Sequence, residues 1–99
     1  WPIEAVPTSY YLHSDKSLKF ERPAVEQGQV TWLADPRQPA SIPGTAFPGA
    51  KDARDFEKQA EVRTFTTDIL TEPVEWTGKV QAELYVLSDA KDTDFIVRI

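Results

Sequence analysis

Hydrophobic and polar positions alternate most regularly in the last third of the chain. In residues 80–86 every second side chain is apolar, and the apolar set is Val80, Ala82, Leu84 and Val86. Because successive side chains of a strand point to opposite faces, this pattern predicts a half-buried β-strand. The polar residues 89–92 predict a turn, and a second strand follows in which one face carries Phe95, Val97 and Ile99.

The first third of the chain predicts a β-hairpin. Two short apolar stretches, 10–13 and 18–20, flank the polar residues 14–17, whose serines and aspartate are typical of turns. Residues 29–33 predict a further short strand, which ends before Pro36 because proline has no backbone N–H to donate. Residues 61–67 are rich in β-branched and aromatic side chains and continue the β-type pattern.

Between these strands the pattern is weaker. Residues 36–49 are mostly Pro, Gly, Ser and Ala, and we expect an irregular connection across the surface. Residues 51–60 have the character of a charged helical turn with little to hold it, because Phe56 is their one large apolar anchor. Hairpins, almost no helix and frequent turn signals predict an all-β fold, either a sandwich or a jelly roll.

Composition limits the size and the partners of this fold. A chain of 99 residues supports one small core, and 40% hydrophobic with 27% charged residues is typical of a soluble globular domain. A net charge of −5 disfavours nucleic acid, and the apolar runs are too short for a membrane helix. The absence of cysteine excludes disulfides and thiolate metal sites. No secretory signal is visible, and the sequence leaves the compartment undetermined.

The two ends predict a longer parent protein. The chain begins at Trp1 and contains no methionine, which differs from an unprocessed translation product. At the other end the strand pattern of residues 95–99 is still running at Ile99. We therefore expect this chain to be one part of a larger polypeptide.

A serine-hydrolase site inside the chain is not supported by its residues. Acyl transfer by a serine needs an imidazole to take the hydroxyl proton and a carboxylate to orient that imidazole. His13 is the only imidazole, and it directly precedes Ser14 and Asp15, whereas sequence neighbours on a strand point to opposite faces. The Gly-x-Ser-x-Gly motif of α/β-hydrolases is absent. We expect His13 to face solvent or to satisfy the turn, and we assign no catalytic residue.

Three carboxylates and several aromatic rings are the remaining candidates for a site. Asp89, Asp92 and Asp94 allow a calcium site, but a turn capped by aspartate side chains is favoured because the loop lacks the glycine and closing glutamate of calcium-binding loops. The sequence therefore predicts neither a metal nor another cofactor. The tryptophans and tyrosines allow a stacking platform for sugars or peptides, although packing in a core or at a domain interface is more common.

Several motifs, in one order along the chain, resemble a known family. They are Phe65-Thr66-Thr67 followed by Leu70, then Thr77-Gly78-x-Val80, then Ser88-Asp89-Ala90-x-Asp92-Thr93-Asp94-Phe95, with weaker matches at Trp1-Pro2, Tyr10-Tyr11-Leu12, Asp35-Pro36-x-x-Pro39, Gly49 and Asp52-x-Arg54. Together they resemble the C-terminal domain of Xaa-Pro dipeptidyl-peptidases and cocaine-esterase-like serine hydrolases. The chain departs from the family at Lys16, where a turn glycine is usual, and at Ala34 and Lys91.

The resemblance implies a fold, a partner and a function. The fold is a galactose-binding-like jelly-roll β-sandwich, of which residues 1–99 are the N-terminal part and the C-terminal half is missing. The partner is an upstream α/β-hydrolase domain that holds the catalytic triad and is absent from this chain. The implied function is a non-catalytic domain that packs on the catalytic domain and shapes substrate access, with domain-interface candidates Trp76, Asp92, Asp94 and Phe95.

Other readings of the sequence stay open. The first is an autonomous carbohydrate- or peptide-binding β-sandwich that uses exposed aromatic rings. The second is a purely structural fragment without a ligand. A homo-oligomer is a further partner that the sequence leaves open, and the parent could act on peptides, esters or amides.

Overall fold

The computed structural model describes residues 4–24, 28–41 and 52–99. The chain forms two compact units: unit 1 consists of Trp1–Val6 and Val74–Ile99, and unit 2 is Pro7–Pro73. The expected irregular connection over residues 36–49 lies partly outside the described residues. In the part that is described, no helix is long and apolar enough to cross a membrane.

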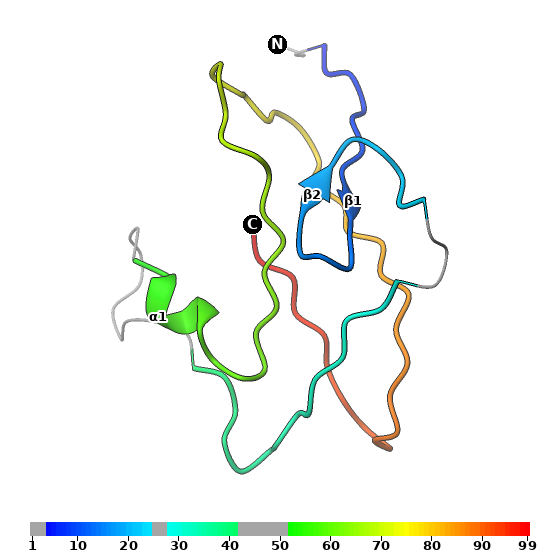
Figure 1. Ribbon diagram of the computed structural model, residues 1–99, viewed down its shortest axis with the longest axis vertical. Helices are drawn as coiled ribbons and strands as arrows, with labels where there is room; N and C mark the ends of the chain where they lie inside the picture. Colours follow the sequence, from blue (N-terminus) through cyan, green and yellow to red (C-terminus); the bar gives the residue numbers. More distant parts are fainter. Residues whose placement is uncertain (1–3, 25–27, 42–51) are drawn as a thin grey trace. The chain divides into compact units, whose positions relative to one another are not determined.

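Unit 2 contains the predicted hairpin. Strand β1, Tyr11–Leu12, pairs antiparallel with strand β2, Leu18–Lys19, and the two arrows lie side by side in Figure 1. Tyr11 is opposite Lys19 and Leu12 is opposite Leu18. The prediction of a hairpin with a turn at residues 14–17 is confirmed, although each strand is only two residues long.

The turn of this hairpin requires a left-handed residue. The Lys16 N–H donates to the His13 carbonyl at 2.9 Å, and the His13 N–H donates to the Ser17 carbonyl at 3.0 Å. Lys16 has φ 70°, as expected for the last residue of a three-residue loop built on a type I turn. Asp15 supports the bend because its Oδ1 accepts the Ser17 N–H at 3.0 Å. The family resemblance places a glycine at position 16, and the positive φ explains that preference.

The predicted strand over residues 61–67 contributes a single parallel bridge. It joins Ser17 to Thr66, where the Leu18 N–H donates to the Thr66 carbonyl at 2.9 Å and the Thr66 N–H donates to the Lys16 carbonyl at 3.0 Å. Regular strands over residues 29–33, 80–86 and 95–99 were also predicted, and the structure assigns no strand there. Those predictions are wrong for this structure. Alternation creates an apolar face, but a strand also needs a neighbour whose backbone groups pair with its own.

A short helix forms within residues 51–60. Helix α1, Arg54–Glu57, is a single turn in which Phe56 is half-buried, and the Glu57 N–H donates to the Ala53 carbonyl at 2.9 Å. The sequence offered little to hold such a turn. The Asp52 side chain adds a local support, since its Oδ1 accepts the Arg54 N–H at 3.0 Å. The described residues thus form a mostly-β fragment with a small antiparallel sheet and little helix.

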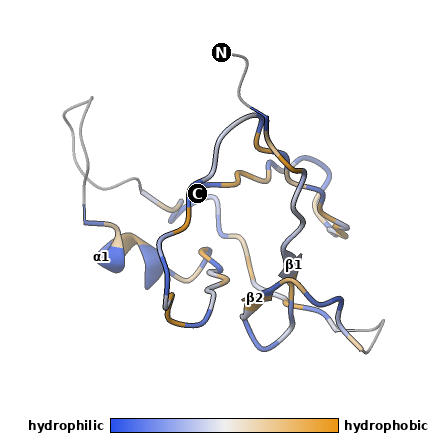
Figure 2. Cartoon of the chain, turned by 90° about the horizontal axis from the view of Figure 1, so that it is seen from above, coloured by the Kyte–Doolittle hydropathy of each residue, from blue (hydrophilic) through white to orange (hydrophobic). Residues whose placement is uncertain are grey.

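No hydrophobic side chain among the described residues is fully buried. The chain exposes 9983 Å², whereas a folded monomeric protein of this mass exposes about 5700 Å². Figure 2 shows hydrophobic stretches on segments that carry neither helix nor strand. Apolar area left in water costs about 25 cal/mol per Å², so this chain has a strong drive to have its apolar surface covered.

The predicted inner face is still visible in unit 1. Leu84 and Val86 are 40% and 53% exposed, whereas their neighbours Tyr85 and Leu87 are 94% and 98% exposed. The same difference separates Phe95, at 38%, from Ile96, at 90%. We call the less exposed set the inner face; it consists of Val80, Leu84, Val86, Phe95 and Val97. It shows the period of two that a sheet would present to a second layer.

Replacing Lys16 by glycine should stabilise the hairpin. A residue with a side chain in the left-handed conformation costs roughly 1–2 kcal/mol, and glycine avoids this strain. Part of the gain is offset because glycine loses more backbone entropy when the chain folds. We expect hydrogen exchange of a peptide covering residues 10–20, measured by mass spectrometry, to slow about two- to fivefold in Lys16→Gly. The control is Lys19→Gly in strand β2, where glycine should speed up exchange. Equal effects of the two changes would contradict this account.

Candidate domain interface

The four predicted interface residues lie in one unit. Trp76, Asp92, Asp94 and Phe95 all belong to unit 1, and all four are exposed. Phe95 is part of the inner face, while Asp92 ends the bend at residues 89–92. No hydrogen bond or ion pair joins the side chain of Asp92 or Asp94 to another described residue. Their role at an interface stays a prediction.

The predicted polar turn after residue 88 is present, but serine caps it. Residues 89–92 form a bend, and the Ala90 N–H donates to the Ser88 Oγ at 3.1 Å. Among the described residues, no three acidic or histidine side chains gather in a way that could hold a metal ion. The expected turn therefore depends on a serine hydroxyl instead of the predicted aspartate side chains, and serine is a common acceptor in such turns.

Trp76 stands at the start of a tight corner. The Thr77 Oγ1 donates to the Glu75 Oε1 at 2.9 Å, and Gly78 has φ 115°. A side chain at position 78 would meet only the Ala5 Cβ, at 3.9 Å, so space would permit one. Glycine is required because residues with a Cβ rarely adopt a φ of this value. The glycine of the Thr-Gly-x-Val motif is therefore explained by the backbone of this corner.

His13 has a structural role in unit 2. Its Nε2 lies 2.8 Å from the Glu21 carbonyl oxygen, and because a carbonyl only accepts, Nε2 carries the proton and donates it. Asp15 is bonded to Ser17 instead of the imidazole. A general base must accept a serine proton on the nitrogen that faces the hydroxyl. The sequence predicted that His13 faces solvent or satisfies the turn; its imidazole instead bonds a backbone carbonyl beyond strand β2.

Aromatic rings in unit 2 pack locally. Tyr10 and Phe20 have centroids 4.5 Å apart, at 35° between ring planes. The guanidinium of Arg22 lies 5.5 Å from the centre of the Tyr11 ring, and Arg63 lies at the same distance from Trp32. Each guanidinium covers a ring face in the geometry of a cation–π contact. These contacts favour packing over a sugar-stacking platform.

The segment 31–41 is held by side chains instead of a backbone ladder. The Gln59 side chain bonds both backbone polar groups of Ser41: its Oε1 accepts the Ser41 N–H at 2.9 Å, and its Nε2 donates to the Ser41 carbonyl at 3.0 Å. Two residues later, Glu61 accepts the Asp35 N–H on Oε1 at 2.6 Å. These bonds span 18 and 26 residues of sequence and fix the segment at two points.

Arg63 provides the third point. Its Nη2 donates to the Thr31 carbonyl at 3.1 Å, and its Nη1 donates to the carbonyls of Ala60 and Val62 at 2.8 and 2.9 Å. We call the side chains of Gln59, Glu61 and Arg63 the clasp. They lie in and just after the turn that follows α1, where the Val62 N–H donates to the Gln59 carbonyl at 3.0 Å. A polar residue at every second position is the sequence signal for the clasp, but it does not specify the partners in the segment 31–41.

A hollow of about 440 Å³ lies beside the clasp. One side is formed by the segment 31–41 and the other by the stretch that carries the clasp; the lining residues are Leu33, Asp35, Gln38, Pro39, Ala40, Gln59, Ala60 and Glu61. Apolar and carboxylate groups therefore share one concave surface of unit 2.

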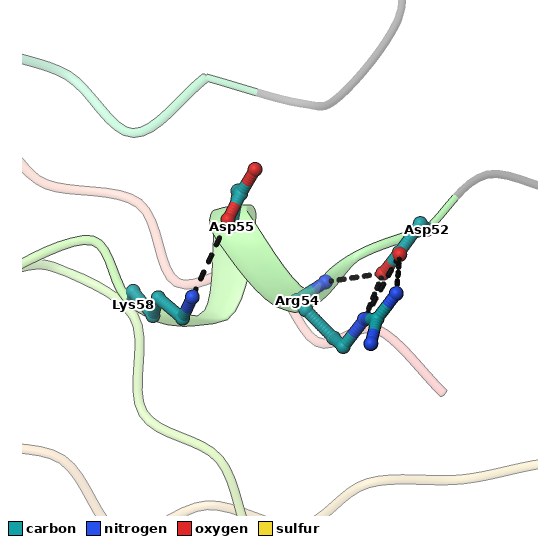
Figure 3. Close-up of polar contacts among 4 residues, drawn as sticks. All are labelled: Asp52, Arg54, Asp55 and Lys58. Carbon is teal, nitrogen blue, oxygen red and sulfur yellow. Dashed lines mark hydrogen bonds and ion pairs between the residues drawn. The ribbon is translucent and has the colours of Figure 1, made fainter.

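Two Asp-x-Arg pairs hold the backbone locally, and Asp35 of the first pair lines the hollow. In the first, both guanidinium nitrogens of Arg37 that face Asp35 donate to its carboxylate, at 3.0 and 3.1 Å, and the Arg37 N–H also donates to it at 3.0 Å. Figure 3 shows the second pair, Asp52 and Arg54, in a similar arrangement at the start of α1. Hydrogen bonds from the arginine side chain, and then from its backbone, lower the pKa of Asp35 and Asp52.

At the C-terminal end of α1 a weaker ion pair joins Lys58, which follows the helix, to Asp55 at 3.4 Å, also drawn in Figure 3. Exposed pairs of this kind contribute little because water and salt screen them. The Asp-x-Arg pairs differ because the aspartate carboxylate also accepts the backbone N–H of the arginine, which holds the backbone between the two residues. The weak family match at Asp52-x-Arg54 therefore has a local structural cause.

Comparison with known proteins covers the whole chain. The family model described as the X-Pro dipeptidyl-peptidase C-terminal non-catalytic domain matches residues 1–99. Cocaine esterase of Rhodococcus sp. is 40% identical over 75 residues, which cover 70% of this chain and 13% of that protein. "Putative serine esterase Mb1866c" of Mycobacterium bovis and "Putative serine esterase MT1883" of Mycobacterium tuberculosis are each 29% identical over 107 aligned positions, 98% of this chain and 16% of theirs. No solved structure matches.

The carboxyl pKa of Asp52 should respond to Arg54. Because the folded pKa is lowered, the pair contributes stability above the ordinary aspartate value, and this contribution is lost as the pH falls below about 4. In Arg54→Gln we expect the Asp52 pKa to rise part of the way back, since the backbone N–H still donates. Carbon-13 NMR of the carboxyl carbons measures this. The Asp35 pKa, held by Arg37, is the internal control and should stay unchanged; a rise in both would contradict the assignment.

Proposed function

Because the chain belongs to the family of X-Pro dipeptidyl-peptidase C-terminal non-catalytic domains, we propose that it serves as the accessory β-sandwich of a serine hydrolase. The resemblance inferred from its motifs is confirmed by the family match and by the esterase relatives. The chain spans 13–16% of the length of these curated relatives. Because most of each relative lies outside the match, we propose that this chain's partner is a catalytic part of the same polypeptide.

The uncovered inner face is the observation that carries the proposal. An alternating face that stays 38–59% exposed needs a second layer at the spacing of packed sheets. We propose that further strands of the same protein supply this layer and complete a jelly roll against the inner face. In that arrangement residues 1–99 form the N-terminal part of the sandwich.

The catalytic chemistry belongs to the other part of the protein. Within this chain the single imidazole is bonded to a backbone carbonyl, and the serine-elbow motif is absent. We propose that an upstream α/β-hydrolase domain holds the serine, histidine and aspartate. Because the named relatives are esterases, an ester is the substrate class that the comparisons favour. The sandwich then supplies packing area and one wall of the substrate entrance, to which Trp76, Asp92 and Asp94 contribute. Phe95, which lies on the inner face, contacts the added strands instead.

Expressing the chain with and without the rest of its polypeptide tests the proposal. The full protein should hydrolyse a small chromogenic ester, and residues 1–99 alone should not. The isolated chain should associate or aggregate, because its apolar faces and unpaired strand edges are uncovered. Size-exclusion chromatography with light scattering measures association, and hydrogen exchange of residues 80–86 should be slower in the full protein.

Two results would contradict the proposal. A monomeric isolated chain with a sharp cooperative melt would show that no further strands are needed. Ester turnover by the isolated chain that disappears in His13→Ala would place catalysis within these residues. A catalytically silent variant of the upstream serine in the full protein is the matched control, since it should keep the exchange protection of residues 80–86.

A further inference from the structure

Leu33 presents an apolar side chain to solvent from a segment that is fixed in place. It is 83% exposed, yet the clasp holds the segment around it at Thr31, Asp35 and Ser41. Ordering a surface segment costs conformational entropy, and exposing a leucine adds an unfavourable hydration term. A rigid segment that displays an apolar group is arranged for contact with another surface.

The cover for Leu33 differs from the cover for the inner face. The inner face repeats every two residues, which suits another sheet of the same sandwich. The segment 31–41 contains Pro36 and Pro39, which have no N–H to donate to a strand ladder. An added strand therefore does not suit this segment, whereas the surface of a neighbouring domain does.

The hollow beside Leu33 indicates the chemistry of that neighbour. Leu33 and Pro39 supply apolar contact, and Asp35 and Glu61 supply carboxylates. Asp35 is already paired with Arg37, whereas Glu61 bonds a backbone N–H and has no ion pair among the described residues. A mixed apolar and polar surface of this kind is typical of interfaces between domains. The unneutralised carboxylate fits a lysine or arginine side chain.

We infer that Leu33 and this hollow form the docking surface for the catalytic part of the same protein, which inserts a basic side chain beside an apolar patch. Glu61 acts as a positioning residue that fixes the Asp35 N–H and attracts the basic group. This inference rests on the proposed function, in which the catalytic part belongs to the 84–87% of the related esterases that lies outside the match. It adds which face of the chain makes the contact.

Photocrosslinking in the full-length protein tests the surface. The crosslinker p-benzoylphenylalanine is placed at position 33 and, as the matched control, at position 87, where Leu87 is 98% exposed beside the inner face. Position 33 should crosslink to a peptide of the upstream part, and position 87 should give at least fivefold less of that product. Crosslinks from position 33 only within the sandwich or to a second copy, or equal yields from both positions, would overturn the inference.

Variants of Glu61 test its positioning role. With the native residue, the yield from position 33 should fall severalfold from 20 mM to 500 mM NaCl, because salt screens the contact with the basic group. Glu61→Gln keeps the acceptor for the Asp35 N–H and removes the charge, so the crosslinked peptide should be unchanged and its yield independent of salt. Glu61→Ala should spread the crosslinks over several peptides. Salt dependence in Glu61→Gln, or a native pattern in Glu61→Ala, would overturn this role.

Ester hydrolysis by the native full-length protein is measured separately. Its absence would refute the proposed activity while leaving the crosslink map intact. A missing crosslink in an active esterase would refute the docking surface alone.

Discussion

An apolar face that the described residues do not cover is the constraint from which the rest of this structure follows. In unit 1 the inner face keeps the period of two that a sheet requires, yet its side chains remain partly in water. Strand geometry depends on a paired neighbour, and apolar burial depends on a second layer. These residues supply neither the paired strand nor the second layer. Residues 80–99 therefore show a less exposed apolar face, as a sheet does, but lack the hydrogen bonds between strands.

Hydrogen bonds from side chains to the backbone hold the ordered parts of the chain. The hairpin turn, the two Asp-x-Arg pairs and the clasp all use side-chain groups to satisfy backbone groups. The bonds of the hairpin turn and of the Asp-x-Arg pairs join residues two apart, whereas those of the clasp reach the distant segment 31–41, and none of them needs a core. They also explain family motifs in physical terms: Gly78 is needed for its φ, and Asp52 for the arginine that follows it.

These features assign different partners to different faces. The inner face suits further strands of the same sandwich, while the segment 31–41, with its prolines and mixed hollow, suits a second domain. A non-catalytic domain of a hydrolase has both needs, because it must complete its own core and also remain attached to the catalytic part. The His13 imidazole, bonded to a backbone carbonyl, takes part in neither contact.

The sequence by itself determined the family, the hairpin around residues 14–17 and the sidedness of residues 80–99, because motif order, turn residues and alternation are all local properties. It did not determine the clasp, because Gln59 and Glu61 meet partners 18 and 26 residues away. The sequence predicted strands at residues 29–33, 80–86 and 95–99 that the structure does not form, and it offered little reason to expect the helix α1 that the structure does form. Only tertiary structure decides such elements, because a ladder needs a second backbone at hydrogen-bond distance and a face needs a surface to cover it.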